Sequence, residues 1–399
     1  MFWAVTVLLS LFIASCKQDP IFFIISQETT PLKPRIEGAP TNMVIFNRTY
    51  SGIANPVPIM YVASGRLHWY AKAPDGKPGW DSGEYPMPQP DGKIISLAVA
   101  GSRMYALCRE GTGVKAELRY IESNGDEWHL IEADTTDLQS IYAAGTRLFA
   151  GAGRNTYKLL YLDNNALKTL KENSALLSGA VYNGSSYYLA TRGGILQIPE
   201  TAFTQGTIAS SISQLSDISS IDDKNNNRMF MSIIMLENNN KDIIAIERNG
   251  GFLYEVSSGS FRRMQYANNN WMATGRYATE AVALWQENPE GGRRLFIVGT
   301  QGNLYTTTSS SYTHGYVEFD LGPDGSFNKS YERRDPSISV HGNTDRYTAS
   351  LGKHPVNHMF QAPKSIDEDM TFFASTQTAG LWSYRYREKN GGWQWNAEE

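Results

Sequence analysis

The sequence predicts an all-β protein, a seven-bladed β-propeller, with six or eight blades as the alternatives. Three observations predict it: a composition rich in Gly and aromatic residues, a strand–turn–strand pattern that occurs seven times, and further strand candidates on both sides of each copy. The 399 residues include 35 Gly, 22 Tyr and 9 Trp, a mixture that favours strands and tight turns over helices. Repeated units of about 40–50 residues with four short strands each are typical of propeller blades.

The repeated pattern is a short apolar run, a turn that contains Gly, and a second apolar run with an aromatic residue. Two related turns, VAGSRMYALC at 99–108 and AAGTRLFAGA at 143–152, are expected to join the first strand of a blade to the second. Gly readily adopts the positive φ that such turns require. The hairpins formed by the second and third strands are expected at 59–71, 103–121, 147–162, 187–198, 243–256, 295–308 and 372–385.

Runs on either side of each hairpin supply the first and fourth strands of a blade. An apolar run precedes it, such as NMVIF at 42–46, and a polar turn with a further run follows most copies. One four-stranded sheet cannot bury both of its faces, whereas sheets packed around an axis can, and a closed ring leaves only short edges. Because the last unit has its own fourth strand in KNGGWQWNAEE at 389–399, closure needs no strand from the N-terminal end.

The chain begins with a segment typical of membrane targeting. Residues 1–15, MFWAVTVLLSLFIAS, are uncharged and apolar, and they suit a signal peptide but are too short to span a membrane. The next residue completes IASC, which resembles the lipobox of bacterial lipoproteins, in which the matching cysteine, here Cys16, is lipidated and becomes the new N-terminus. Residues 16–40 are then a lipid-anchored tether, and residues 41–399 form the propeller domain. An ordinary cleaved signal peptide or a buried strand is the alternative.

Charge and the reactive residue types exclude several classes of function. A net charge of −4 argues against nucleic-acid binding, which normally requires a basic surface. With Cys16 and Cys108 as the two cysteines, we expect no structural disulfide, and Cys108 is expected to be a small buried hydrophobic residue. His354 and His358 have the spacing of a metal pair on a helix, but Pro355 argues against a helix there. We therefore expect no catalytic set, no metal site, no cofactor and no enzyme activity.

The longest interruption of the repeat lies at about 320–353, between the sixth and seventh units, and it exceeds the length of a hairpin connection. Loops held by a rigid scaffold commonly carry recognition, and Tyr and Arg are enriched at binding hot spots. A disordered segment without a function is the alternative. As candidate binding residues we select Tyr331, Arg333, Arg334, His341 and Arg346.

The combination of the lipobox-like Cys16, a tether with several Pro residues and the seven-unit repeat resembles the treponemal-type (spirochaetal) β-propeller envelope lipoproteins. The resemblance covers about residues 41–399. It implies a protein of the bacterial cell envelope that is lipid-anchored at the outer membrane, on its surface or its periplasmic side, and we expect a monomer. Some members of that group are adhesins for fibronectin and laminin, so the resemblance implies a protein partner from the host matrix. A periplasm-facing scaffold in outer-membrane assembly and a propeller enzyme acting on sugars or lactones are the alternatives.

Overall fold

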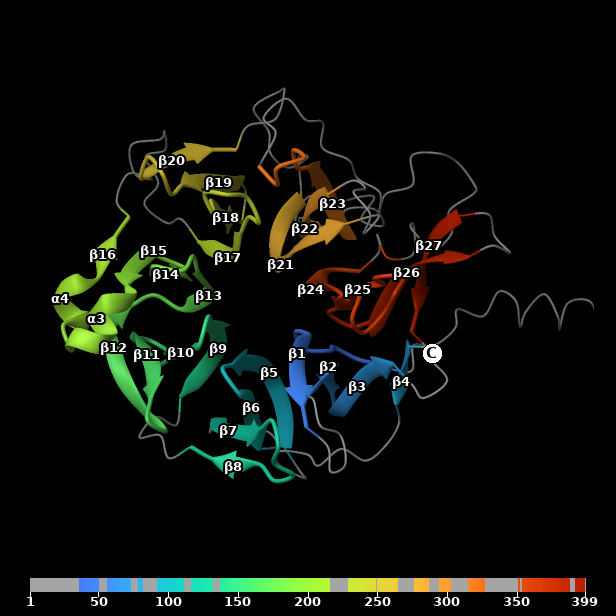
Figure 1. Ribbon diagram of the computed structural model, residues 1–399, viewed down its shortest axis with the longest axis horizontal. Coiled ribbons are helices and arrows are strands. Elements are labelled where there is room, and N and C mark those ends of the chain that lie inside the picture. Colours follow the sequence, from blue (N-terminus) through green and yellow to red (C-terminus); the bar gives the residue numbers. More distant parts are fainter. Residues whose placement is uncertain are drawn as a thin grey trace, which may run out of the picture.

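The predicted seven-bladed β-propeller is confirmed by the computed structural model, in which seven antiparallel sheets stand around a central axis (Figure 1). Two short helices lie among the described residues. None of the described helices is long and apolar enough to span a membrane. The structure describes residues 36–49, 56–72, 78–81, 92–110, 116–131, 137–215, 229–248, 250–264, 276–286, 294–302, 315–326, 351, 354–387 and 392–398.

The first three blades each contain four strands in chain order. Blade 1 consists of β1 (Val44–Arg48), β2 (Val57–Ser64), β3 (Arg66–Lys72) and β4 (Pro78–Asp81). Blade 2 consists of β5 (Gly92–Ala100), β6 (Arg103–Glu110), β7 (Ala116–Glu122) and β8 (His129–Leu130). Blade 3 consists of β9 (Leu138–Ala144), β10 (Arg147–Ala152), β11 (Tyr157–Asp163) and β12 (Ala166–Ser174).

The remaining blades follow the same order around the ring. Blade 4 has β13 (Leu177–Tyr182), β14 (Ser186–Thr191), β15 (Gly194–Pro199) and β16 (Ser213–Gln214), with α3 (Glu200–Gln205) and α4 (Ile208–Ser211) before β16. Blade 5 has β17 (Phe230–Met235), β18 (Ile243–Glu247), β19 (Gly250–Glu255) and β20 (Ser260–Arg263). The described part of blade 6 has β21 (Arg276–Gln286), β22 (Arg294–Gly302) and β23 (Gly315–Asp320). Blade 7 has β24 (Val356–Gln361), β25 (Phe372–Thr376), β26 (Leu381–Arg387) and β27 (Gly392–Ala397).

Six of the seven predicted hairpins are confirmed, and the one in blade 6 was wrong. Strand β22 pairs with β21 on one side and with residues 315–320 on the other, so the run at 304–308 is not the third strand of that blade. Residues 315–319 are all buried, and Val317 and Phe319 join the core between blades 5 and 6. The Thr-rich run at 304–308 offers fewer apolar side chains for that position. The predicted insertion therefore begins directly after the third strand.

The two related turns join first and second strands, as expected. Gly101 and Gly145 both have positive φ, at 61° and 56°. At Gly145 a Cβ atom would lie 2.8 Å from a ring carbon of Tyr182 in the next blade, so this glycine also permits close packing between blades. The turn chemistry was readable from the sequence because it is local.

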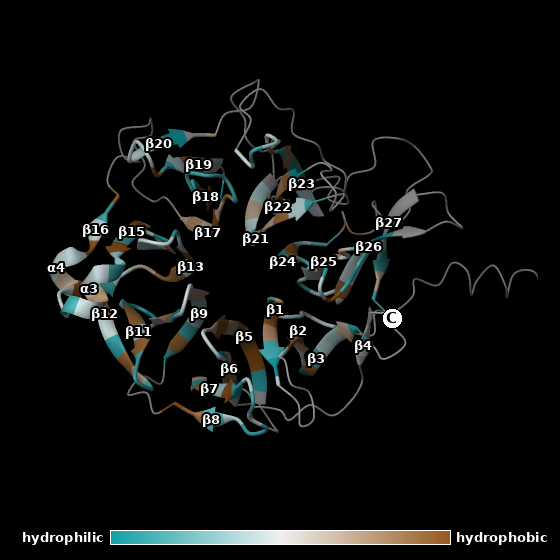
Figure 2. Ribbon diagram, in the orientation of Figure 1, coloured by the Kyte–Doolittle hydropathy of each residue, from teal (hydrophilic) through white to brown (hydrophobic). Residues whose placement is uncertain are grey.

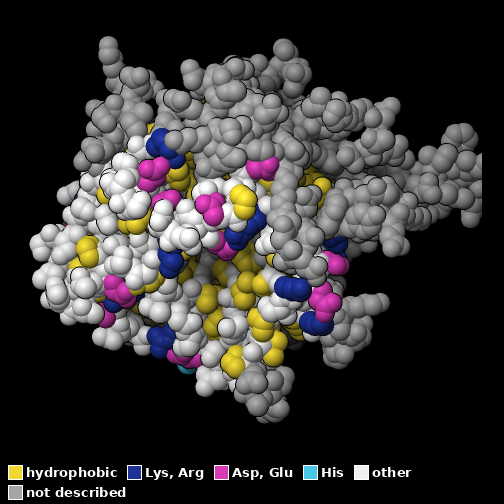
Figure 3. All heavy atoms as spheres, turned by 45° about the horizontal axis from the view of Figure 1, so that its top comes forward, with side chains coloured by type: hydrophobic (Ala, Val, Ile, Leu, Met, Phe, Trp, Pro, Cys, Tyr) yellow, Lys and Arg dark blue, Asp and Glu magenta, His cyan; other side chains and the backbone are white. Residues whose placement is uncertain are grey.

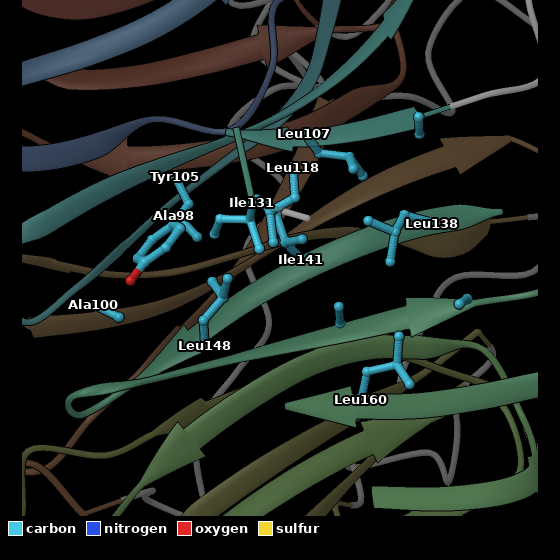
Figure 4. Close-up of a cluster of buried hydrophobic side chains, with 13 residues drawn as sticks. Ala98, Ala100, Tyr105, Leu107, Leu118, Ile131, Leu138, Ile141, Leu148 and Leu160 are labelled. Atoms are coloured by element: carbon cyan, nitrogen blue, oxygen red, sulfur yellow. The ribbon is translucent and has the colours of Figure 1, made fainter. Parts of the chain in front are cut away.

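The hydrophobic core lies between the blades. The buried side chains of the described residues form seven clusters, and each cluster joins two neighbouring blades. Figure 4 shows the cluster in which Leu107 and Leu118 of blade 2 face Leu138, Ile141 and Leu148 of blade 3. In Figure 2 the inner strand β13 is largely hydrophobic, whereas the outer strand β20 is hydrophilic. Each blade is therefore stable only beside its neighbours, as expected for a ring of single sheets.

The first strand of every blade lies nearest the axis (Figure 1), and in six blades this strand contains a register shift near its start. In contrast, β1 pairs with β2 in regular register. A bulge bends a strand, raises its twist and redirects side chains. Near two of these shifts, hydroxyl groups bond to the backbone of the next blade. Ser140 donates to the Leu177 carbonyl at 3.0 Å, and Thr279 donates to the Val356 carbonyl.

Blade 7 and blade 1 close the ring at a contact that we call the seam. Residues 36–41, which precede the first strand, lie against blade 7. The amide of Leu381 donates to the carbonyl of Ile36 at 3.0 Å, and the Ser375 hydroxyl donates to the carbonyl of Thr41 at 3.1 Å. Because blade 7 has four strands of its own, closure without a strand from the N-terminal end is confirmed.

Two buried carboxylates connect the two sides of the seam. Glu398, 7% exposed, accepts hydrogen bonds from Trp80 Nε1 at 2.8 Å and from Arg385 Nη2 at 3.1 Å. Asp367, 2% exposed, accepts a hydrogen bond of 2.8 Å from the Tyr70 hydroxyl. Burial raises the pKa of Tyr70, so this hydroxyl keeps its proton and remains a donor. The seam thus combines an apolar core with polar contacts that cross from one blade to the other.

Candidate binding site

The residues selected from the sequence lie outside the described part of the chain. This holds for Cys16 with the whole segment 1–35, and for the five insertion residues Tyr331, Arg333, Arg334, His341 and Arg346. The described ends of the insertion are residues 320–326 and Leu351. Leu351 is fully buried in the cluster between blades 6 and 7, so the end of the insertion is fixed to the core. The role of these residues in binding stays a prediction.

The histidine pair and the cysteine considered from the sequence lie in strands or directly beside one. His358 lies on strand β24 and His354 just before it, so the helix that could form a metal pair is absent there. No group of three His, Cys, Asp or Glu within the described ranges could hold a metal ion. Cys108 is fully buried, and burial raises the pKa of its thiol to about 12. Its predicted role as a small buried hydrophobic residue is confirmed.

We expect His358 to make the protein sensitive to acid. Burial lowers the pKa of His358 to about 4, against an ordinary value of 6.5. Between these values the unfolded chain binds a proton that the folded chain does not, so folding stability falls as the pH drops from 6.5 towards 4. The shift corresponds to about 3 kcal/mol in the free energy of unfolding. The measurement is urea unfolding at pH 7.5 and pH 4.5 for the wild type and His358→Gln, with exposed His129→Gln as the control. An equal loss of stability in all three proteins would contradict this assignment.

The ring brings together three polar side chains that are far apart in the sequence. Tyr142 lies on β9 of blade 3, Arg192 directly follows β14 of blade 4, and Glu280 lies on β21 of blade 6. Arg192 Nη2 is 4.0 Å from Glu280 Oε1. Besides burial, the charge of Glu280 raises the pKa of Tyr142, and the charge of Arg192 lowers it. We call these three residues the channel cluster, because two of them belong to the inner strands around the axis (Figure 1).

Burial controls the electrostatics of the channel cluster. Burial raises the pKa of Glu280, and the positive charge of Arg192 opposes this shift without cancelling it. Burial also raises the pKa of Tyr142, with the charge of Glu280 acting in the same direction, so the phenol remains protonated. The side chains of Arg192 and Glu280 are still 38% and 40% exposed. The cluster is therefore a partly desolvated acid–base pair that an external group can reach.

Apolar side chains on the inner strands surround the axis near this cluster. Partly exposed hydrophobic residues of these strands include Ile95, Val99, Val181, Ile234 and Val282. Figure 3 shows hydrophobic side chains gathered at a hollow in the ring, with basic and acidic side chains beside it. A largely apolar surface with a few polar groups is typical of sites that bind ligands or proteins.

A small pocket of about 110 Å³ lies between blades 5, 6 and 7. Gln361, a polar residue that lines the pocket, forms hydrogen bonds within the fold. Its Nε2 donates to the carbonyls of Gln286 and Met370 at 2.8 and 3.0 Å. Its Oε1 accepts a hydrogen bond from the Gln286 amide at 2.9 Å. Arg294 at the rim pairs with Glu237. These contacts connect neighbouring blades, so we assign the pocket a structural role.

Sequence reasoning missed all three residues of the channel cluster. Glu280 stands out in the sequence as the single charge before the apolar run AVALW, and Arg192 occurs in the Gly-containing turn TRGG. Neither feature indicates that the two residues meet. Their proximity depends on the positions of blades 4 and 6 around the ring, which a local pattern does not contain.

Comparisons with known proteins place the chain in the class of β-propellers. No protein-family model matches it, and no curated protein matches its sequence. Among solved structures, one described as YCF48 bound to D1 peptide matches with a TM-score of 0.50 and 9% identity, over 89% of this chain and 94% of that one. At this identity the likeness shows the fold alone.

Two further solved structures match over similar lengths. A chain of a mitotic checkpoint complex has a TM-score of 0.49 and 8% identity, and the match covers 93% of this chain and 95% of that one. A protein from Lactobacillus plantarum has a TM-score of 0.48 and 11% identity, over 90% of this chain and 96% of that one.

Proposed function

We propose that this chain is a lipid-anchored envelope protein whose propeller binds protein partners, with host fibronectin and laminin as the first candidates. The observation that carries the proposal is the channel cluster, where Tyr, Arg and Glu from three blades meet beside partly exposed apolar side chains. Tyr and Arg are over-represented at the energetic centres of protein interfaces. A rigid ring also holds its loops in fixed positions, which lowers the entropy cost of binding.

Two further arguments support the proposal. A propeller with the same fold is described with a bound peptide, so this architecture can serve peptide recognition. The sequence IASC at 13–16 supports an anchor at Cys16, and residues 17–35 would connect it to the folded body that begins at the seam. Several acyl chains, each with many buried CH₂ groups at about 0.8 kcal/mol apiece, would keep the protein on a membrane.

The test uses bacterial cells that make either the full wild-type chain or Cys16→Ser. We expect an alkyne fatty acid to label the wild type and not the variant, and only the wild type to remain in the membrane fraction. We expect wild-type cells to adhere to immobilised fibronectin or laminin more than cells that carry the empty vector. Protease treatment of intact cells should remove the propeller, and adhesion should be lost with it.

The outcomes separate the proposal from its alternative. Equal labelling of the wild type and Cys16→Ser would contradict lipidation at Cys16. Protection from protease on intact cells, together with no adhesion to either matrix protein, would contradict the adhesin function. That result would favour the periplasm-facing scaffold in outer-membrane assembly.

A further inference from the structure

We infer that Glu280 forms an ion pair with a cationic side chain, Lys or Arg, of a protein partner. This side chain would bind near Tyr142 and would displace Arg192 from Glu280. This inference rests on the proposed protein-binding function and adds to it the place and the chemistry of the contact. Two observations carry it: the loose fit of the present ion pair, and the way in which the fold aims Glu280.

The present partner of Glu280 fits it loosely. The 4.0 Å between Arg192 Nη2 and Glu280 Oε1 exceeds the 2.8 Å between Arg119 and Glu117 and the 3.1 Å between Arg385 and Glu398. Hydrogen bonds between charged groups are normally about 2.7–2.9 Å long. The carboxylate of Glu280 therefore has capacity for a closer cation.

The backbone of β21 aims Glu280 away from the core. Ala278 pairs with Thr300 and Val282 pairs with Val298, so three residues, 279–281, lie opposite Gly299. Thr279 and Ala281 are buried, at 5% and 1% exposure, whereas Glu280 between them is 40% exposed. At Gly299 a Cβ atom would lie 2.5 Å from both neighbours, Thr279 Oγ1 and Ala281 Cβ. The glycine makes room for the bulge, and the bulge presents the carboxylate.

The carboxylate that the bulge presents favours a cation as the ligand. Burial disfavours the charge of Glu280, and Arg192 compensates that cost only in part. The side chains of Glu280 and Arg192 are about equally exposed, at 40% and 38%, so both remain accessible. A cation bound at Glu280 would relieve the remaining cost.

The remaining neighbours suit a long cationic side chain. Tyr142, whose phenol remains protonated, adds a neutral polar group within electrostatic reach of Glu280. Partly exposed apolar residues of the inner strands, such as Val282, can cover the aliphatic part of Lys or Arg. The ligand class is therefore an extended peptide segment that inserts one basic side chain at the axis of the ring.

The experiment measures binding of short peptides to the purified full chain by calorimetry at low salt. The probes are acetyl-Ala-Ala-Arg-Ala-Ala-amide and the same peptide with citrulline, which keeps the shape of Arg without its charge. We expect the citrulline peptide to bind at least about 10-fold more weakly, which corresponds to about 1.4 kcal/mol. Glu280→Gln should weaken binding of the Arg peptide to a similar extent. Arg192→Gln should strengthen it several-fold, because the competing cation is removed.

Glu237→Gln is the matched control, since Glu237 is an exposed carboxylate paired with Arg294 away from the cluster. It should bind the Arg peptide as the wild type does, and circular dichroism should show that all variants are folded. Equal binding of the two peptides, equal binding by Glu280→Gln and wild type, or no binding of the Arg peptide at about millimolar concentration would overturn the inference.

Parallel binding to immobilised fibronectin and laminin separates this inference from the proposed function. If the wild type and Glu280→Gln bind a matrix protein equally, the protein-binding function is supported and the proposed role of Glu280 is contradicted. If the wild type binds the Arg peptide through Glu280 but binds neither matrix protein, the cation site stands and the adhesin function fails.

Discussion

Replacing Glu398 by alanine is expected to lower the free energy of unfolding by about 3–5 kcal/mol, because it removes the buried acceptor of an ion pair and of two further hydrogen bonds. Trp80 and Arg385 would lose their common acceptor, and Ser383, which also donates to this carboxylate, is fully buried. The loss falls on the seam, where blade 7 and blade 1 each consist of four strands of their own among the described residues. The measurement is equilibrium unfolding in urea, followed by circular dichroism.

The control for this prediction is Glu368→Ala, which removes another carboxylate at the seam. Glu368 is 75% exposed and pairs with Lys72, which is 45% exposed, so we expect a change too small to resolve. If Glu398→Ala is no less stable than Glu368→Ala, the buried carboxylate of Glu398 contributes nothing to the stability of the seam.

Trp395→Ala is expected to cost a similar amount, about 3–5 kcal/mol, because it leaves a large cavity in a closed core. Trp395 is fully buried between blades 6 and 7, with ring centroids of Tyr384, Tyr316 and Phe372 at 5.2, 5.5 and 5.9 Å. Its Nε1 also donates to the Tyr316 hydroxyl at 3.2 Å. The same urea experiment measures the loss.

Two variants separate the contributions of Trp395. Trp395→Phe keeps most of the volume and removes the hydrogen bond, so it should cost clearly less than alanine. Trp382→Ala removes a partly buried ring from the same cluster and should also be milder. A Trp395→Ala protein as stable as Trp382→Ala would show that the core between these blades can collapse around the missing ring.

The fold could be predicted because most of its signals are local. The turns at Gly101 and Gly145 require a particular backbone conformation, and each apolar run marks a strand covered on both faces. The third strand of blade 6 was missed because the choice between 304–308 and 315–320 depends on which run fills the core of the neighbouring blade. That information lies in another part of the chain.

The candidate site could not be predicted for a related reason. Tyr142, Arg192 and Glu280 belong to three blades, and only closure of the ring brings their charges within reach of one another. Sequence reasoning instead selected the long insertion, whose length is visible without knowledge of the ring. The roles of Cys16 and of the insertion residues stay predictions, with the tests described above.

One residue at the seam holds both ends of the described chain. The amide of Leu381 donates to the carbonyl of Ile36, and the carbonyl of Leu381 accepts the amide of Glu398 at 2.9 Å. These contacts close the ring, so closure does not depend on the blade at which the polypeptide begins. A circular permutant, with the two ends joined by a short linker and the chain opened between two other blades, would follow the same path around the axis. The order of the blades along the chain is therefore one of several that would specify this ring.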